Sequence, residues 1–176
     1  ASTLQMRYAD RYVSFLQPGE EVVTSTYLSV LTKKPDASFV SRTFFPETKQ
    51  LIEQYQSTDA QGKDRKGPYQ SWWDNGNRNS VGQYEAGKRE GQWTNYNFDD
   101  GAKLEEGNYS AGKKTGEWLR YDDKERKEFL TYFDSGEKTR EIKYDSTGTV
   151  VADFKLDGGE IVEALVGEIP DPDNYR

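Results

Sequence analysis

Residues 82–93 read GQYEAGKREGQW and residues 107–118 read GNYSAGKKTGEW, so seven of twelve positions agree at an offset of 25. The same spacing continues outside these segments, because Gly67, Gly91 and Gly116 are separated by 24 and 25 residues. Self-similarity at a fixed period is the signature of repeat architectures, in which each copy is one supersecondary unit. A tandem array of units of about 25 residues therefore decides the fold.

Weaker copies flank the three clear units on both sides. We therefore divide the chain into residues 1–40, a region of N-terminal strands or a cap, residues 41–156, the tandem repeats, and residues 157–176, an acidic C-terminal tail or linker. The repeats are clearest over residues 67–121. Atypical end copies are typical of repeat arrays, where they cap the outer units.

Each unit holds two short runs that suit β-strands, such as Trp93–Phe98 and Leu104–Tyr109. Residues 99–101 (Asp-Asp-Gly) and 111–113 (Ala-Gly-Lys) separate such runs, and glycine with Asp or Asn is typical of tight turns. The sequence thus predicts an all-β fold, an elongated, twisted, largely single-layer antiparallel meander of tandem β-hairpins. We expect roughly ten strands of about five to seven residues, with a short helix at one or both ends.

The N-terminal region admits two interpretations. Apolar residues recur near helical spacing between Leu4 and Leu16, but the run Tyr12–Leu16 suits a strand equally. Residues 17–20 (Gln-Pro-Gly-Glu) are predicted to turn, and Val22–Leu31, the most apolar run, is predicted to be a strand.

The C-terminal region carries a short apolar segment between Ile161 and Val166. Its spacing gives one apolar stripe on a helix. A helix or a strand here would cover the last sheet edge, which would otherwise favour aggregation. The alternative is a docking segment for a partner. Residues 171–174 (Asp-Pro-Asp-Asn) are interpreted as a linker or as an acidic recognition tail.

Aromatic residues are expected on both faces of the sheet, because successive side chains of a strand alternate. In the Trp93–Phe98 run, Trp93 lies on one face and Tyr96 on the other. Gly82 and Gly107 precede tyrosines by two residues, and a missing side chain there leaves room for a neighbouring ring to lie flat. Alternation of glycine and aromatic residues is the packing rule that we predict.

Charge is concentrated at one end of the chain. The formal net charge is −7, and residues 157–176 contribute six acids against one base. The repeats are therefore nearly neutral and lack the Lys/Arg excess that phosphate backbones or anionic lipids require. No run approaches the length of a membrane span. We expect neither a nucleic-acid partner nor direct insertion into a membrane.

The sequence gives little indication of an enzyme active site. The sequence has no His and no Cys, which removes the usual general base, the thiol nucleophile and thiolate zinc sites. A paired-carboxylate glycosidase is formally open, but no motif points to it. Asp-rich turns such as residues 99–101 lack the ligand spacing of a calcium loop. We expect no catalytic residues, no metal site and no cofactor.

The candidate binding residues are the aromatic side chains of the repeats. A single-layer sheet leaves one face uncovered, so some rings are either packing residues alone or also part of a partner surface. The candidate residues are Trp72, Trp73, Tyr84, Trp93, Tyr96, Tyr109, Trp118 and Tyr121.

The pattern resembles the MORN repeat family in its bacterial variant. The resemblance rests on residues 91–96 (GQWTNY), Gly101, residues 107–109 (GNY), residues 112–113 (Gly-Lys) and residues 116–118 (GEW). It implies open single-layer antiparallel sheets used for protein contacts and assembly, and in some bacterial proteins antitoxin-like roles. The outer units depart from the pattern because they lack Gly-Lys or Trp.

The order of strands, repeats and acidic tail also resembles the exported repeat regions of TonB-type energy-transducer proteins of Bacteroidetes. That resemblance implies an exported protein in the periplasm or cell envelope of a Gram-negative bacterium, with the cytoplasm as the alternative. The leading functional hypothesis is a non-catalytic scaffold that presents an aromatic face to a protein partner or to its own copy as a homodimer. The alternatives are a carbohydrate- or peptidoglycan-binding module, with a glycan partner, and an antitoxin-like immunity protein.

Overall fold

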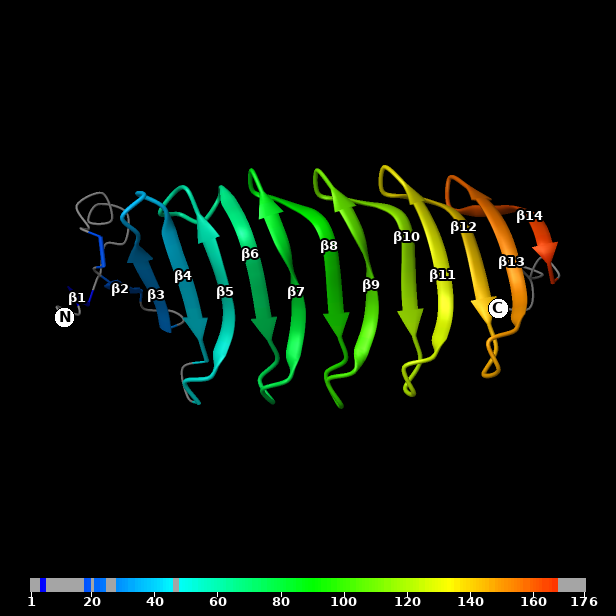
Figure 1. The fold of residues 1–176 in the computed structure, drawn as a ribbon, viewed down its shortest axis with the longest axis horizontal. Helices are drawn as coiled ribbons and strands as arrows, with labels where there is room; N and C mark the ends of the chain where they lie inside the picture. The colour runs from blue at the N-terminus through cyan, green and yellow to red at the C-terminus, as the bar shows by residue number, and fades with distance from the viewer. Residues whose placement is uncertain (1–3, 6–17, 20, 25–27, 46–47, 168–176) are drawn as a thin grey trace.

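The computed structural model describes residues 4–5, 18–19, 21–24, 28–45 and 48–167. Within them, fourteen strands form one sheet in which strand order follows chain order (Figure 1). Every neighbouring pair is antiparallel except the first, which is parallel. The predicted all-β, single-layer antiparallel meander is confirmed. The strands are β1 (Leu4–Gln5), β2 (Glu21–Thr24), β3 (Leu28–Lys33), β4 (Phe39–Phe44), β5 (Leu51–Ser57), β6 (Arg65–Trp72), β7 (Arg78–Glu85), β8 (Lys88–Tyr96), β9 (Lys103–Ser110), β10 (Lys113–Tyr121), β11 (Lys127–Asp134), β12 (Glu137–Tyr144), β13 (Val150–Asp157) and β14 (Glu160–Val166).

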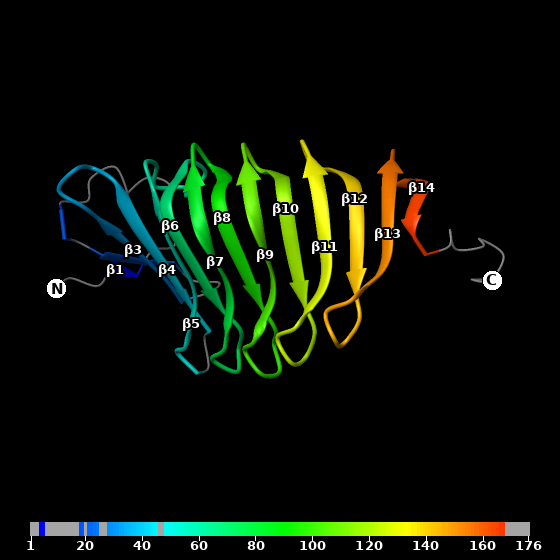
Figure 2. The same ribbon diagram turned by 45° about the vertical axis from the view of Figure 1, so that its right-hand side comes forward.

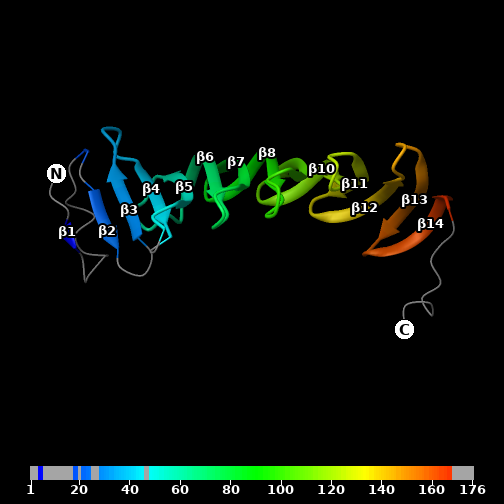
Figure 3. The same ribbon diagram turned by 90° about the horizontal axis from the view of Figure 1, so that it is seen from below.

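The sheet is a long strip that twists along its length, as the oblique view and the view from below show (Figures 2 and 3). A β-bulge recurs near the start of every second strand from β5 to β13. In each case one extra residue interrupts the register with the preceding strand, and bulges of this kind increase local twist. The extra residues are Ile52, Asn79, Leu104, Glu128 and Val151.

Tight two-residue turns join β7 to β8, β9 to β10, β11 to β12 and β13 to β14 along one long edge of the sheet. In the turn between β9 and β10, Ala111 has φ 49° and Gly112 has φ 87°. Two successive positive φ values define the turn type whose twist matches that of the flanking strands. The Gly112 amide also donates to the Arg89 carbonyl of the preceding hairpin at 2.9 Å. The Gly87 and Gly136 amides donate in the same way to the Arg65 and Lys114 carbonyls, so these three turns tie one hairpin to the preceding one.

Longer loops built around an Asp or Asn side chain join the strands along the other edge. The Asp145 carboxylate accepts hydrogen bonds from the Thr147 and Thr149 amides at 2.8 and 3.0 Å. Asp122 accepts in the same way from the Lys124 and Arg126 amides. These bonds satisfy backbone donors that no strand pairs, which explains the Asp residues of the loops without a metal ion.

The strands are more numerous and longer than we expected, since most from β6 to β13 contain eight or nine residues. The most apolar N-terminal run, Val22–Leu31, is not one strand, because its residues contribute to two antiparallel strands, β2 and β3. Most of the segment for which helix and strand were both considered, residues 6–17, lies outside the described residues, as do residues 171–174.

At the C-terminus the helical interpretation of residues 161–166 is wrong. These residues belong to β14, which pairs with β13 inside the segment that we expected to be a tail or linker. Gly158 and Gly159 form the two-residue turn between the strands, both at positive φ. That turn commits the following apolar run to a hairpin strand.

The hydrophobic core is thin. Among the described residues, the buried hydrophobic side chains are Phe39, Val40, Trp93, Trp118 and Ile142. Trp93 is 0% exposed and Trp118 is 3% exposed, although the described residues form no second layer over the sheet. Their burial therefore comes from neighbouring side chains on the same face of the sheet.

Candidate functional site: the ladder face

Two glycines make room for the two buried tryptophans. A Cβ added to Gly82 would lie 2.2 Å from Cδ2 of Trp93, and one added to Gly107 would lie 2.4 Å from Cδ2 of Trp118. Each indole therefore lies flat against a glycine of the preceding strand, as the alternation of glycine and aromatic residues predicted. The indole N–H groups of Trp93 and Trp118 donate to the carbonyls of Gln83 and Asn108 at 3.1 and 3.0 Å.

Rings follow one another across the strands on the face that holds these tryptophans, which we call the ladder face. Along it, neighbouring ring centroids are 5.1–6.3 Å apart, and most pairs meet edge to face. Such pairs are favourable beyond the area that they bury. The rings are Tyr69, Tyr84, Trp93, Tyr109, Trp118 and Phe133.

Basic side chains recur at one position of each unit on the ladder face. Arg65 lies 4.0 Å from the Tyr55 ring centroid, Arg89 lies 4.2 Å from that of Trp93, and Lys114 lies 3.8 Å from that of Trp118. Cations over aromatic faces are stabilising, more so where water is excluded. The long Arg and Lys side chains therefore cover the exposed side of the rings. This cover accounts for the burial of the tryptophans without a second layer.

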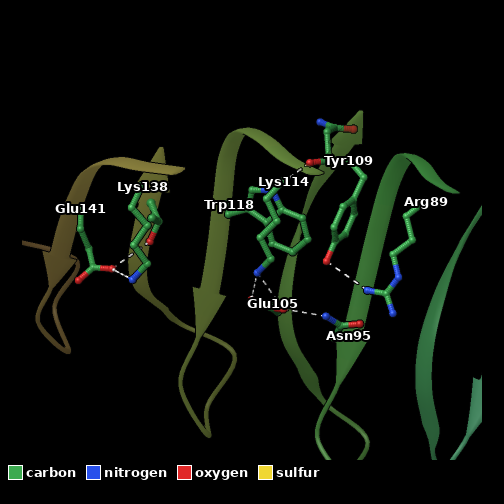
Figure 4. A network of polar contacts seen from close by, with 10 residues as sticks. Arg89, Asn95, Glu105, Tyr109, Lys114, Trp118, Lys138 and Glu141 are labelled. Carbon is green, nitrogen blue, oxygen red and sulfur yellow. Dashed lines mark hydrogen bonds and ion pairs between the residues drawn. The ribbon is translucent and has the colours of Figure 1, made fainter. Parts of the chain in front are cut away.

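Four strands carry a cation at this position, and three of the four cations have a carboxylate partner. Arg65 pairs with Glu53 at 3.8 Å, and Lys114 pairs with Glu105 at 3.0 Å. Lys138, which occupies the equivalent position of β12, pairs with Glu141 at 2.8 Å. Figure 4 shows the last two pairs beside the Trp118 ring. At these three positions, the charge of the repeated cation is therefore balanced by a glutamate.

Arg89 differs from the other three. It donates to the Tyr109 hydroxyl at 3.1 Å, as Figure 4 shows, but within the described part of the chain it has no carboxylate partner. Burial opposes its charge, while hydrogen bonds with Tyr84 and Tyr109 outweigh that effect and raise the pKa of Arg89. Arg89 is therefore a permanent, half-buried cation whose charge no acid of the described chain neutralises.

A pocket of about 450 Å³ opens beside Arg89 on the ladder face. Small polar side chains form part of its wall, and the Ser71 and Ser80 hydroxyls are hydrogen-bonded to each other there at 2.9 Å. A second hollow of about 310 Å³ lies two units further on, over β9 to β12. The first pocket is lined by Glu53, Tyr69, Ser71, Ser80, Arg89 and Asn95, together with Ile52, Trp72, Trp73, Asn79, Tyr96 and Leu104.

The reverse face holds a tyrosine–carboxylate pair. Tyr121 donates a hydrogen bond to Glu106. Burial, and after it the hydrogen bond to Glu106 and that group's charge, raise the pKa of Tyr121 to about 12. The same hydrogen bond is the main reason why the pKa of Glu106 is lowered. This pair joins the neighbouring strands β9 and β10, and it lines neither of the two pockets described above.

The eight candidate binding residues divide between these places. Tyr84, Trp93, Tyr109 and Trp118 belong to the ladder, where the two tryptophans are buried and the two tyrosines are partly exposed. Trp72, Trp73 and Tyr96 line the larger pocket, and the Trp73 indole N–H donates to the Tyr96 carbonyl at 3.3 Å. Tyr121 lies on the reverse face.

Sequence reasoning missed the basic rows and Ser80. The signal was present, because Arg89 and Lys114 occupy the same position in the two clearest copies. Neither residue was assigned a role from the sequence. Ser80 belongs to no sequence motif. Its equivalence to Glu53 and Glu105 becomes visible only in the register between the strands.

Comparisons with known proteins identify no family for this chain. No protein-family model matches the chain, and no curated protein matches it. Among solved structures, a TarM mutant from S. aureus in complex with fondaparinux, alpha-GlcNAc-glycerol and UDP has a TM-score of 0.36 at 10% identity, and covers 77% of this chain. A second TarM crystal structure has a TM-score of 0.36 at 11% identity, and covers 88%. The chain spans only 21% and 23% of those proteins, and TM-scores this low carry no argument.

Two further searches concern the described residues alone. No group of three or more His, Cys, Asp or Glu side chains in that part of the chain is arranged to hold a metal ion. The same residues contain no helix with the length and apolar character needed to cross a membrane.

Proposed function

We propose that the chain is a non-catalytic protein-interaction module that binds a protein partner through the ladder face. The observation that carries the proposal is the make-up of that face. Half-exposed tyrosines, repeated cations and a pocket of about 450 Å³ lie on a sheet that no second layer of described residues covers. Aromatic and arginine side chains are the residues most enriched in the energetic centres of protein interfaces.

The structure favours a protein partner over a glycan. Sugars stack on open ring faces, but Trp93 and Trp118 are covered by the Arg89 and Lys114 side chains. A partly charged surface with scattered, half-exposed tyrosines suits a protein partner better. The resemblance to MORN repeats supports the same function. We further propose the periplasm or cell envelope as its location, which fractionation of the source cells will test.

A photo-cross-linking experiment tests the proposed face. Asn95 and Thr94 are adjacent and partly exposed, but they lie on opposite faces of β8, with Asn95 on the ladder face. A benzoylphenylalanine residue is placed at one position or the other in the full chain, and the source cells are irradiated. We expect a discrete cross-linked protein from position 95 that excess unlabelled chain competes away, and none from position 94.

Other outcomes would contradict the proposed face or point to a different partner. A cross-link of equal yield from both positions, or none from either, would contradict the proposed face. A cross-linked species with twice the mass of the chain would identify the partner as a second copy. Quenching of tryptophan fluorescence by soluble polysaccharide, without any cross-linked protein, would favour the glycan-binding alternative.

A further inference from the structure

On the ladder face, one ion pair joins β5 to β6 and recurs between β9 and β10, but it is missing between β7 and β8. In the register, Glu53, Ser80 and Glu105 occupy the same position, directly after the bulge residue of β5, β7 and β9. The cations of the following strands, Arg65, Arg89 and Lys114, are equivalent in the same way. Two of the three units thus pair a glutamate of one strand with a cation of the next, but the middle unit has a serine.

The missing glutamate leaves both a space and a charge. Ser80 is short, and its hydroxyl is hydrogen-bonded to Ser71 rather than to a charged group. The larger pocket opens in front of these two serines. Arg89 lines the same pocket, and no carboxylate in the described chain pairs with it. In the next unit the corresponding space is filled, because Glu105 accepts from both Lys114 and Asn95.

We propose that the carboxylate of an Asp or Glu side chain from the protein partner enters this pocket and pairs with Arg89, taking the place that Glu53 and Glu105 hold in the adjacent units. The inference rests on the proposed function and names the chemistry of the partner's anchoring residue. The half-buried guanidinium supplies the charge, and the Asn95 amide and the two serine hydroxyls line the approach.

The pocket suits a carboxylate better than a phosphate group. One unpaired cation matches one negative charge, and guanidinium groups bind carboxylates in a planar, two-point geometry. Glu53 also lines the pocket, and the chain carries a net charge of −7, so a doubly charged anion meets repulsion there. A partner side chain arrives on a larger complementary surface, which compensates for the weak affinity of a lone carboxylate.

The first test uses a probe of known chemistry on the full chain. The Arg89 Nε–H signal is followed by NMR while acetyl-Gly-Glu-Gly-amide is added at millimolar concentration, with acetyl-Gly-Gln-Gly-amide as the matched control. We expect the glutamate peptide alone to shift the signal, which is assigned by its loss in Arg89→Gln. A response to both peptides, a response to neither, or a larger response to inorganic phosphate would overturn the proposal.

Two variants sharpen the experiment. Ser80→Glu restores the carboxylate that the adjacent units possess, so it should compete with the probe and weaken its binding at least about tenfold. Lys155→Gln removes an exposed cation of β13 that is paired with Glu163 at 2.7 Å, and should leave binding of the probe unchanged. Thermal unfolding of each variant verifies the fold. If Ser80→Glu does not fold, Arg89→Gln followed through the Trp93 indole signal decides, with loss of the shift expected.

The partner found by cross-linking distinguishes this inference from the proposed function. Replacing its contacting Asp or Glu with Asn or Gln should weaken the complex at least about tenfold with the natural chain, and much less with Arg89→Gln, in a double-mutant cycle. Cross-linking from position 95 without any coupling to Arg89 would leave the interaction module standing and refute the carboxylate site. Absence of a cross-link together with absence of a probe response would refute both.

Discussion

Gly107→Ala is the substitution that most sharply tests the packing of the ladder. An alanine Cβ at this position would lie 2.4–2.5 Å from the Cγ, Cδ2 and Cε2 atoms of Trp118. Carbon atoms in contact are about 3.5–4.0 Å apart, so the indole must move by about 1 Å or more. It cannot do so freely, because Lys114 lies over the ring at 3.8 Å and the Tyr109 and Phe133 rings lie beside it.

The free-energy cost follows from three contributions. Overpacking costs about 1–3 kcal/mol. Displacement of the indole weakens the hydrogen bond from Trp118 to the Asn108 carbonyl, at about 1 kcal/mol. Against this, alanine is favoured over glycine within a strand by about 0.5–1 kcal/mol, because φ of Gly107 is not in the left-handed region. We expect a net loss of about 1–3.5 kcal/mol, with a central value of about 2 kcal/mol.

Thermal unfolding followed by circular dichroism measures this loss, and a decrease of roughly 5–10 °C is expected for a chain of this length. Asn108→Ala is the matched control, since it changes the next residue, an exposed side chain on the other face, and should alter stability by less than about 0.5 kcal/mol. An unfolding temperature of Gly107→Ala equal to or above that of the natural chain would refute the account of how Trp118 is buried.

Three further predictions concern other parts of the sheet. Because the pKa of Tyr121 is raised to about 12 by burial and Glu106, its contribution to stability is full below pH 10 and is lost as the pH rises toward 12. Tyr121→Phe should flatten the decline in unfolding temperature over that range, and an unchanged alkaline profile would contradict this reasoning. The Arg140 hydrogen bond lowers the pKa of Asp153, so Asp153→Asn should reduce the unfolding temperature at neutral pH and lose its effect as the pH falls through that lowered pKa. Gly112→Ala places a side chain at φ 87° and should cost about 1 kcal/mol in urea unfolding, whereas an unchanged midpoint would show that the turn can relax.

Much of the fold could be predicted from the repeat. The spacing of Gly and aromatic residues gave the hairpins and the one-layer sheet, and the absence of a side chain at Gly82 and Gly107 predicted the flat rings. The short apolar run of residues 161–166 was harder, because its spacing gives an apolar stripe on a helix although the run forms a strand. The Gly158-Gly159 pair before it, a signal for a two-residue hairpin turn, would have decided between them.

The candidate site depended on tertiary information that the repeat alone does not contain. The sequence leaves open whether Trp93 and Trp118 only pack or also face a partner. In the structure, Arg89 and Lys114 cover their rings. The cations lie over the rings because of the register between the strands. Glycines at positive φ and β-bulges set that register. Ser80 acquires its meaning only when that register aligns it with the glutamates of the adjacent units.

The most direct test of the central claim, that the ladder face binds the partner, is hydroxyl-radical footprinting of the complex between this chain and the protein that cross-links to it. Tyr84 and Tyr109 are partly exposed on the ladder face, and Tyr121 and Tyr132 are partly exposed on the reverse face. The account predicts that oxidation of the first pair falls on binding while oxidation of the second pair stays constant. Protection of Tyr121 and Tyr132, with Tyr84 and Tyr109 unchanged, would contradict it.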